Sequence, residues 1–399
     1  MIYFDVTRLL EWQGSYTGME RVAYELALNM TKEKDAQATR LVYFTEAAGF
    51  VDVTDEVTWS NGRLVSKVTH QGSIRQMVKT EPVNAIKEYL RRNYHDRILE
   101  KYPKIAPGHG SVLFISDGLW DRASYIDEVV KTAHTGVKIG HLVHDMVPLV
   151  VPHVCHDFVT KAIKDYFTVI TPFIDVLVSI SKNTESDFFT YFGEYAKPTI
   201  ERVIIRHGED FTKGNDSKPA IIGNLNDFVL CVGTLEIRKN HLLLYQSYKL
   251  AAQQGIELPP LVIVGREGWL TEQTMKLIRD DPEVKDKILL AGPVSDAELA
   301  WLYKHCSFTT LAALYEGWGL QVAESLYYGK VCAVSNAGPL PEVGGDLNVY
   351  FSPYNTQECL NALQNLANKT TRKILEAKIK KEYKPTTWHD AAKTITSAL

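Results

Sequence analysis

The feature that most constrains the fold is an alternation of short apolar runs and amphipathic helical segments that starts afresh near the middle of the chain. Strands that alternate with helices in this way form parallel sheets covered by helices. The sequence therefore predicts an α/β protein with two Rossmann-like sheets. The expected strands are Met1–Thr7, Val112–Ile115, Val137–Val143, Val176–Ile180 and Val203–Arg206, then Phe228–Gly233, Leu261–Val264, Ile288–Leu290, Ser307–Ala313 and Val331–Ser335.

The length of 399 residues is large for one hydrophobic core and sufficient for two domains. The segment Phe211–Ala220 is rich in small, polar and turn residues and is typical of a linker. We therefore expect an N-terminal domain over residues 1–212 and a C-terminal domain over residues 213–385. Residues 386–399 are expected to form one last helix.

The stretch LYEGWGLQVAESLYYGK, residues 314–330, carries the strongest functional signal. Gly317 and Gly319 allow the backbone to pass close to a ligand, because neither has a side chain in the way. A helix that begins at about Leu320 directs free N–H groups and the positive end of its dipole toward this turn. The pattern favours an anion site at the turn.

Two carboxylates belong to the same stretch. Glu316 stands in the loop at the mouth of the expected helix. Glu324 lies about 12 Å further along the helix axis, at a rise of about 1.5 Å per residue. This spacing is suited to the two ends of an elongated polyol phosphate such as a nucleotide sugar.

Arg238 and Lys239 follow a strand of the second half and are expected at the same sheet edge as Glu316. Together they can neutralise a diphosphate, Arg as a bidentate fork and Lys as a point charge. The chain has no Asp-x-Asp motif, the usual holder of Mg²⁺ or Mn²⁺ beside a diphosphate. We therefore expect a metal-free site without a cofactor, in which Arg238, Lys239 and the helix start hold the diphosphate.

Polar residues also follow strands of the first half, where doubly wound sheets bind ligands. His144 and Asp145 come directly after one strand, and Asp117 follows another. A glycine-containing loop with Gly18 follows the first strand. It lacks the Gly-x-Gly-x-x-Gly spacing and is weak evidence alone.

Three segments together resemble retaining GT-B glycosyltransferases of the GT4 type, the group 1 family. They are residues 314–330, the segment VGTLEIRKN at 232–240 and the segment HDMVP at 144–148. The resemblance is dense over Phe228–Asp346 and thin over 46–110. Thr234 departs from it, since some members have a basic residue there, and this leaves open which of the two cations dominates. The resemblance implies two Rossmann-like domains facing across a cleft, with a C-terminal helix that crosses back to the first.

The resemblance also implies a role for each site residue. Glu316 binds the hydroxyls of the transferred sugar, Glu324 binds the ribose, and His144 lies close to the transferred sugar. Glu342 is expected to be structural. The other implied donor contacts are the backbone at Gly319 and Leu320, the loop at Val294 beside the base, and Gly18 with Arg21.

These features predict a retaining, metal-independent glycosyltransferase of bacterial surface polysaccharide synthesis. It transfers a hexose from a nucleotide diphosphate sugar, with a GDP-mannose-like donor favoured, to a saccharide or lipid-linked saccharide. The alternatives are a UDP-hexose-dependent transferase of the same fold and a non-catalytic nucleotide-sugar-binding module. A nicotinamide-dependent oxidoreductase is disfavoured, since neither half opens with the dinucleotide fingerprint.

Net charge, cysteine spacing and hydropathy limit the partners and the cellular compartment that we expect. A net charge of −4 argues against a nucleic-acid partner. The five cysteines have no Cys-x-x-Cys spacing and are expected to be buried apolar residues in a reducing compartment. No signal peptide and no apolar run long enough to span a bilayer is expected, so the prediction is a cytoplasmic protein.

Residues 73–104 are basic and expected to be helical, with eight Lys or Arg against four acids. A solvated helical face is the simpler interpretation. The alternative is a patch that docks on anionic lipids at the inner face of the plasma membrane, where a lipid-linked acceptor would be presented.

Overall fold

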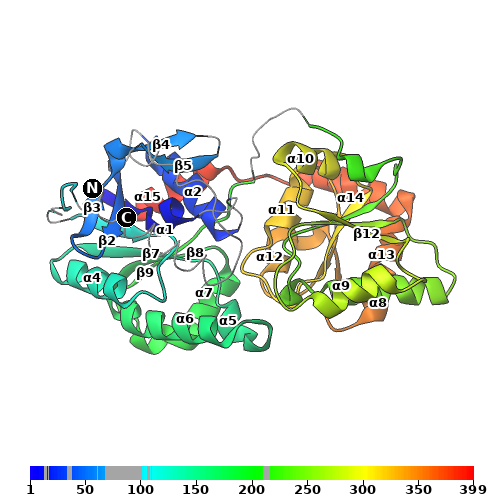
Figure 1. Cartoon of the computed structure of the whole chain (residues 1–399), viewed down its shortest axis with the longest axis horizontal. Helices are drawn as coiled ribbons and strands as arrows, with labels where there is room; N and C mark the ends of the chain where they lie inside the picture. The colour runs from blue at the N-terminus through cyan, green and yellow to red at the C-terminus, as the bar shows by residue number, and fades with distance from the viewer. Residues whose placement is uncertain are drawn as a thin grey trace, which may run out of the picture.

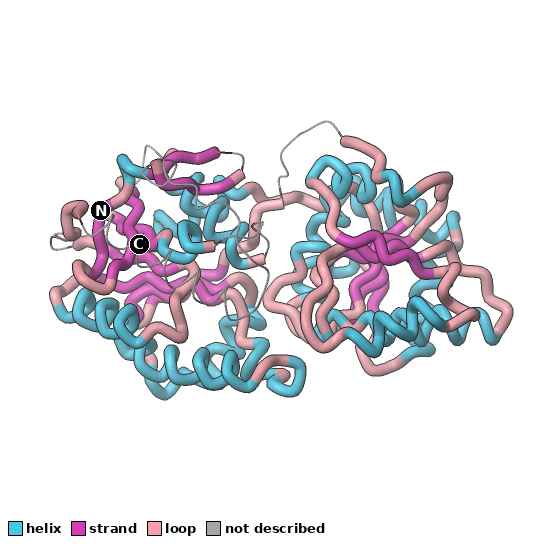
Figure 2. Tube along the Cα trace, in the orientation of Figure 1, coloured by secondary structure: helices cyan, strands magenta, loops and turns pink. Residues whose placement is uncertain are grey.

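The computed structural model describes residues 1–12, 16, 18–33, 38–60, 62–67, 101–105, 108, 110–209 and 216–399. It consists of two lobes that lie side by side, the N-terminal half in blue to green and the C-terminal half in green to orange (Figure 1). In each lobe the strands occupy the middle and helices lie on either side (Figure 2). The two expected α/β units are therefore confirmed.

The N-terminal lobe is built on a seven-stranded sheet of order β3-β2-β1-β6-β7-β8-β9, in which β2 and β3 are antiparallel and all other neighbours are parallel. The strand order reverses between β1 and β6, so the carboxyl ends of these two strands flank a crevice. The strands are β1 (Ile2–Asp5), β2 (Thr39–Thr45), β3 (Gly49–Asp52), β6 (Val112–Ile115), β7 (Lys138–Val143), β8 (Ile174–Ser179) and β9 (Glu201–Ile204).

Helices cover this sheet, and a separate antiparallel hairpin lies beside it. The helices are α1 (Thr7–Glu11), α2 (Met19–Met30), α4 (Ala123–His134), α5 (Val147–Val150), α6 (Asp157–Ile170) and α7 (Lys182–Phe192), and the hairpin strands are β4 (Val57–Ser60) and β5 (Arg63–Ser66). Every residue of β1 and of β6 is buried, as expected for parallel strands with helices on both faces.

The C-terminal lobe has a six-stranded, wholly parallel sheet of order β12-β11-β10-β13-β14-β15. Its order reverses between β10 and β13. The strands are β10 (Val229–Val232), β11 (Leu261–Val264), β12 (Ile288–Gly292), β13 (Phe308–Leu311), β14 (Cys332–Ser335) and β15 (Val349–Phe351). The helices are α8 (His241–Gln253), α9 (Glu272–Asp280), α10 (Asp296–His305), α11 (Leu320–Tyr327), α12 (Leu340–Gly344), α13 (Thr356–Ala367) and α14 (Lys369–Glu382).

The last helix, α15 (Trp388–Ala398), returns to the N-terminal lobe and packs against α2 (Figure 1). Its start is fixed by a capping box, in which Thr387 accepts from the backbone of Asp390 and Asp390 accepts from the backbone of Thr387. Trp388 is buried.

Four expectations need correction or lie outside the described residues. The first strand, expected over Met1–Thr7, ends at Asp5, and Thr7 already begins α1, because Asp5 accepts from the backbone and hydroxyl of Thr7 and turns the chain directly into a helix. Four cysteines are buried, but Cys155 is half-exposed. The proposed domain boundary falls within residues 210–215, and most of the basic segment falls within residues 68–100, both outside the described residues.

The lobes contact each other through the loop that precedes α11. The carbonyl oxygen of Gly317 accepts from the hydroxyls of Ser181 (3.2 Å) and Thr184 (3.1 Å). The Glu342 carboxylate accepts from the backbone N–H groups of Lys182 (2.9 Å) and Asn183 (2.8 Å), at the positive end of α7. Glu342 therefore has the structural position expected of it.

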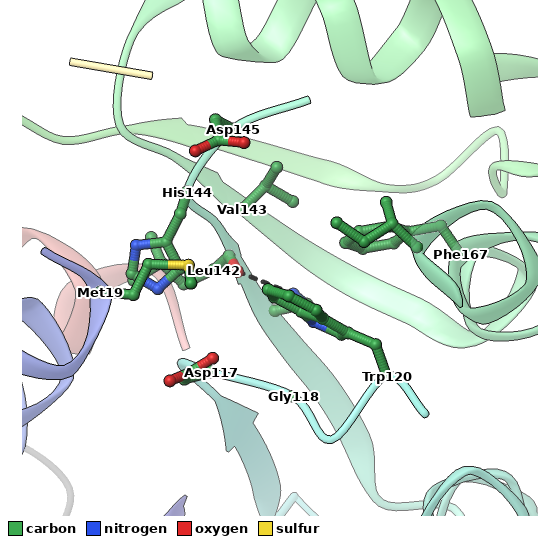
Figure 3. Close-up of a pocket in the computed structure, with 11 residues that line it drawn as sticks. Met19, Asp117, Gly118, Trp120, Leu142, Val143, His144, Asp145 and Phe167 are labelled. Atoms are coloured by element: carbon green, nitrogen blue, oxygen red, sulfur yellow. Dashed lines mark hydrogen bonds between the residues drawn. The ribbon is translucent and has the colours of Figure 1, made fainter. Parts of the chain in front are cut away.

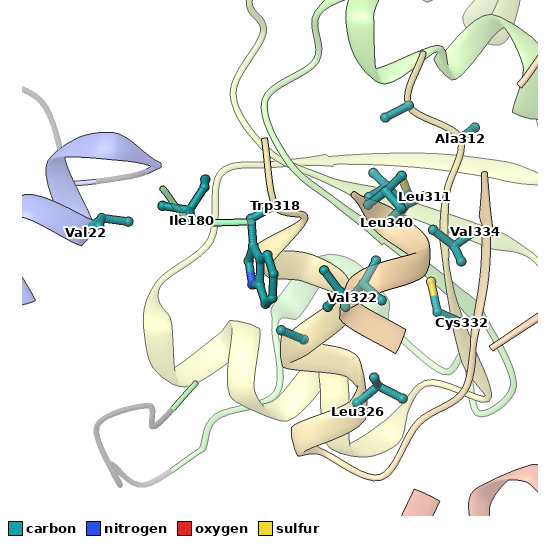
Figure 4. Packing of buried hydrophobic residues seen from close by; sticks show 14 of the residues in the cluster. Val22, Ile180, Leu311, Ala312, Trp318, Val322, Leu326, Cys332, Val334 and Leu340 are labelled. Atoms are coloured by element: carbon teal, nitrogen blue, oxygen red, sulfur yellow. The ribbon is translucent and has the colours of Figure 1, made fainter. Parts of the chain in front are cut away.

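Apolar side chains complete this contact. Trp318 is buried, and its ring lies between Ile180 of the N-terminal lobe and Val322 of α11 (Figure 4). Val322, Leu326 and their neighbours fill the space between α11 and the sheet, so α11 is held firmly at the lobe interface. Among the described residues, no helix is long and apolar enough to cross a membrane.

Candidate active site

The structure brings Glu316, Arg238 and Lys239 together. Glu316 forms an ion pair with Lys239 Nζ at 2.5 Å and with Arg238 Nη1 at 2.8 Å. Arg238 and Lys239 follow β10 in the short helix Ile237–Lys239, and Glu316 follows β13. Since β10 and β13 are the neighbours at which the strand order reverses, this group lies at the crevice where an open α/β sheet binds ligands.

The charges in this group hold each other in the ionised state. Burial alone would raise the pKa of Glu316, but the Arg238 guanidinium and the Lys239 ammonium outweigh it and keep the pKa below its usual value. Burial likewise opposes the charge of Arg238, yet the neighbouring carboxylates raise its pKa overall. Both partners are therefore charged at neutral pH.

Arg238 is more fully engaged than the sequence suggested. Its Nη2 donates to Glu236 at 2.5 Å and its Nη1 to the carbonyl of Tyr315 at 2.9 Å. Glu236 was missed, although it stands only two residues before Arg238. The cations expected to hold a diphosphate are thus partly neutralised by Glu316 and Glu236, and a bound diphosphate must share them.

Gly317 and Gly319 have different structural roles, whereas both were expected to let the backbone pass close to a ligand. Gly319 has φ +100° and directly precedes α11, a left-handed conformation that favours glycine. At Gly317, a Cβ atom would come within 2.3 Å of the carbonyl oxygen of His144. Gly317 is therefore required by the close approach of the other lobe. Leu320 begins α11 as predicted.

Glu324 faces the N-terminal lobe from α11. It is buried, Tyr303 donates to it at 2.6 Å, and Arg21 Nη1 lies 3.9 Å from its other oxygen. Burial raises its pKa, and the positive charge of Arg21 opposes that rise. Gly18, with φ +57°, is the residue before α2 and lies one turn before Arg21. The start of α2 is thus brought toward the expected ribose site.

Val294 lies apart from this group. It follows β12, which is separated from β10 by β11, and it packs against the apolar cluster that includes Val264 and Leu302. The expected contact of Val294 with the base stays a prediction.

His144 approaches the Glu316 group from the opposite lobe. Its Nε2 donates to the carbonyl of Ser116 at 2.6 Å, which leaves Nδ1 as a hydrogen-bond acceptor. Burial lowers the pKa of His144 to about 4, so the ring is neutral at pH 7. Asp145, which follows it, accepts from the backbone of Val147 and faces the charge of Arg238. His144, Asp145 and Asp117 line one pocket (Figure 3).

Among the described residues, no three His, Cys, Asp or Glu side chains are grouped so that they could hold a metal ion. The arrangement offers one buried cation (Lys239), one partly buried cation (Arg238), a helix N-terminus and a neutral histidine around one crevice. It can bind a diphosphate with an attached polyol and stabilise charge that develops on the phosphate.

Comparisons with known proteins give the family and the fold that this chain resembles. Residues 215–384 match the family model of the glycosyl transferases group 1. The chain is 30% identical to O-antigen chain mannosyltransferase B of Escherichia coli over 165 residues, which are 41% of this chain and 43% of that protein. It is 24% identical to the serotype-specific mannosyltransferase WbdA of Escherichia coli over 241 residues, 55% of this chain and 29% of that protein.

The whole fold also has solved counterparts. The sucrose-phosphate synthase of Thermosynechococcus elongatus superposes with a TM-score of 0.67 at 14% identity, covering 100% of this chain and 97% of that one. The fold is GT-B, as expected. The matched segments span less than half the length of the curated mannosyltransferases.

Proposed function

We propose that this chain is a retaining glycosyltransferase that moves a mannosyl residue from GDP-mannose to a saccharide acceptor in surface polysaccharide synthesis, because residues 215–384 match the glycosyl transferases group 1. The observation that carries the proposal is the buried group of Glu316, Arg238 and Lys239, which lies at the crevice of the C-terminal sheet and faces the N-terminus of α11. The mannosyl group is favoured by the mannosyltransferases among the relatives.

In this mechanism the departing diphosphate is stabilised by Lys239, Arg238 and the backbone N–H groups before α11. The bond between the anomeric carbon and the phosphate oxygen breaks, and the acceptor hydroxyl forms its bond on the same face. Its proton passes to an oxygen of the leaving phosphate, so no separate protein base is needed. Glu316 binds sugar hydroxyls and shares its two cations with the diphosphate.

The nucleotide is proposed to extend from this crevice along α11, with its ribose at Glu324. Tyr303 already donates to one oxygen of Glu324, which leaves the oxygen that faces Arg21 for a ribose hydroxyl. The proposed domain boundary near residue 212 places all of these donor contacts, except those from Gly18 and Arg21, in the C-terminal domain.

The binding of nucleotides tests this assignment. Calorimetry with GDP, UDP and ADP is expected to give the tightest binding for GDP, and Glu324→Gln is expected to weaken it about 10-fold through loss of a charged hydrogen bond. Glutamine can still accept from Tyr303, so the fold is kept. Glu272→Gln, an exposed acid at the start of α9, is the matched control. An unchanged dissociation constant for Glu324→Gln would contradict the ribose role, and tightest binding of UDP would move the donor to a UDP-hexose.

Metal independence is a second measurable consequence. If protein cations hold the diphosphate, transfer from GDP-mannose should proceed at an unchanged rate after treatment with EDTA. Restoration of a lost rate by Mn²⁺ or Mg²⁺ would refute the metal-free mechanism. A lipid-linked acceptor, and contact of the basic segment with anionic lipid, stay proposals that rest on sequence alone.

A further inference from the structure

A group of acids at the crevice of the N-terminal sheet is not used by the mechanism above. Asp5 ends β1, Asp117 follows β6, and Glu20 lies in the first turn of α2. Because the strand order reverses between β1 and β6, this crevice is the N-terminal counterpart of the one that holds Glu316.

Asp117 differs from Asp5 in its hydrogen bonds. Asp5 accepts from Thr7 and from the hydroxyl of Tyr125 at 2.6 Å, so both of its oxygens serve the fold. The Oδ2 atom of Asp117 has no hydrogen-bond partner among the described residues, although only 4% of its side chain is exposed. Its nearest cation, Arg8, lies at 3.9 Å. A buried carboxylate oxygen without a donor is costly, and a ligand hydroxyl would satisfy it.

The location of Asp117 suits an acceptor. It lines the pocket with Met19, Trp120 and His144, and Figure 3 shows Asp117, Met19 and His144 along one side of it. The backbone of His144 touches Gly317, the residue next to Glu316, so this pocket opens beside the proposed position of the transferred sugar.

The charge around Asp117 selects the kind of ligand. Glu20 is also buried and has Arg8 at 3.9 Å, so two carboxylates share one guanidinium. Burial raises the pKa of Asp117 to about 7; the charge of Arg8 opposes the rise, and Glu20 and Asp5 add to it. A pocket with more carboxylates than cations accepts hydrogen bonds from ligand hydroxyls and repels ligands that carry phosphate or carboxylate groups.

We propose that Asp117, supported by Glu20 and Arg8, binds a hydroxyl group of an uncharged sugar acceptor. This inference rests on the glycosyltransferase function proposed above and names its acceptor class. The Asp117 carboxylate accepts the hydrogen bond and is an acceptor-binding residue that holds the incoming sugar next to His144.

The test compares Asp117→Asn with wild type and with Asp121→Asn, an exposed aspartate in the same loop. The donor is GDP-mannose and the acceptor is methyl α-mannoside. Asp117→Asn is expected to raise the KM for the acceptor about 10- to 100-fold at pH 8, while hydrolysis of GDP-mannose without acceptor stays at the wild-type rate. Asp121→Asn should match wild type in both assays. Mannose 6-phosphate should be at least about 10-fold poorer as an acceptor for the wild type.

A pH profile gives a readout that a structural role would not produce. The KM of the wild type for methyl α-mannoside should rise as the pH falls from 8 to 6, because Asp117 becomes protonated, and the KM of Asp117→Asn should stay flat. His144 is neutral over this range, so it adds no step. The same pH profile measured on Glu20→Gln shows how much of the change in KM comes from titration of Glu20. The other titratable or charged groups around Asp117 are Asp5, Arg8, Tyr125 and Tyr166, and His141 and Asp145 line the same pocket.

Several results would overturn the inference. They are a wild-type acceptor KM in Asp117→Asn, an equal loss of hydrolysis and transfer in that variant, and equal use of mannose 6-phosphate. If Asp117→Asn does not fold, the wild type alone decides: a KM for methyl α-mannoside that does not change between pH 6 and 8 would contradict the inference. If the wild type neither binds nor hydrolyses GDP-mannose, the proposed function itself is refuted. This result distinguishes a failure of the proposed function from a failure of the inference about Asp117.

Discussion

Glu316→Gln is expected to lower the rate of sugar transfer by about 10²- to 10³-fold while changing the affinity for GDP by less than about threefold. The amide keeps the shape of the side chain but loses the charge that orients Lys239 and Arg238 and accepts sugar hydroxyls. In the proposed binding mode the nucleoside and most of the diphosphate do not contact Glu316, so binding of GDP should survive. Initial rates with GDP-mannose and calorimetry with GDP measure the two quantities.

The choice of glutamine matters because Glu316 is also part of a buried charge network. Glu316→Ala would leave Lys239 and Arg238 without their shared carboxylate, and breaking a buried ion pair costs about 3–5 kcal/mol. A loss of activity in the alanine variant could therefore reflect unfolding. Glu382→Gln, an exposed acid at the end of α14, is the matched control. Full activity of Glu316→Gln would remove Glu316 from the site.

The bounds of several strands and helices could be predicted, because residues close together in the sequence determine them. The bounds Val112–Ile115 and Leu261–Val264 agree with the structure to the residue, since short apolar runs and flanking turns define them. The start of α11 at Leu320 follows from Gly319.

What the sequence did not provide depends on groups that meet only in three dimensions. The contact of Gly317 with His144 joins two lobes, and no periodicity in either segment encodes it. The pairing of Arg238 with Glu236 depends on side-chain conformations in one loop. Asp117 was visible as a residue after a strand, but its unpartnered oxygen required knowledge of every neighbour.

The same network indicates which of the two cations acts on the diphosphate. Arg238 is bound by Glu236, Glu316 and the carbonyl of Tyr315, whereas among the described residues Lys239 Nζ donates only to Glu316. An ammonium group has three donors, so Lys239 retains capacity for phosphate oxygens. We therefore propose that Lys239 acts mainly in catalysis and that Arg238 acts mainly in holding the loop.

Lys239→Met, which keeps the length of the side chain, is accordingly expected to lower kcat by about 10²- to 10³-fold and to weaken binding of GDP about 10-fold, with a small change in melting temperature. Arg238→Met should instead lower the melting temperature strongly, since it leaves Glu236 and Glu316 short of a partner. Lys384→Met, an exposed lysine after α14, is the matched control for the lost charge. If Lys239→Met kept the wild-type kcat, the diphosphate would have to be stabilised by Arg238 and the start of α11 alone.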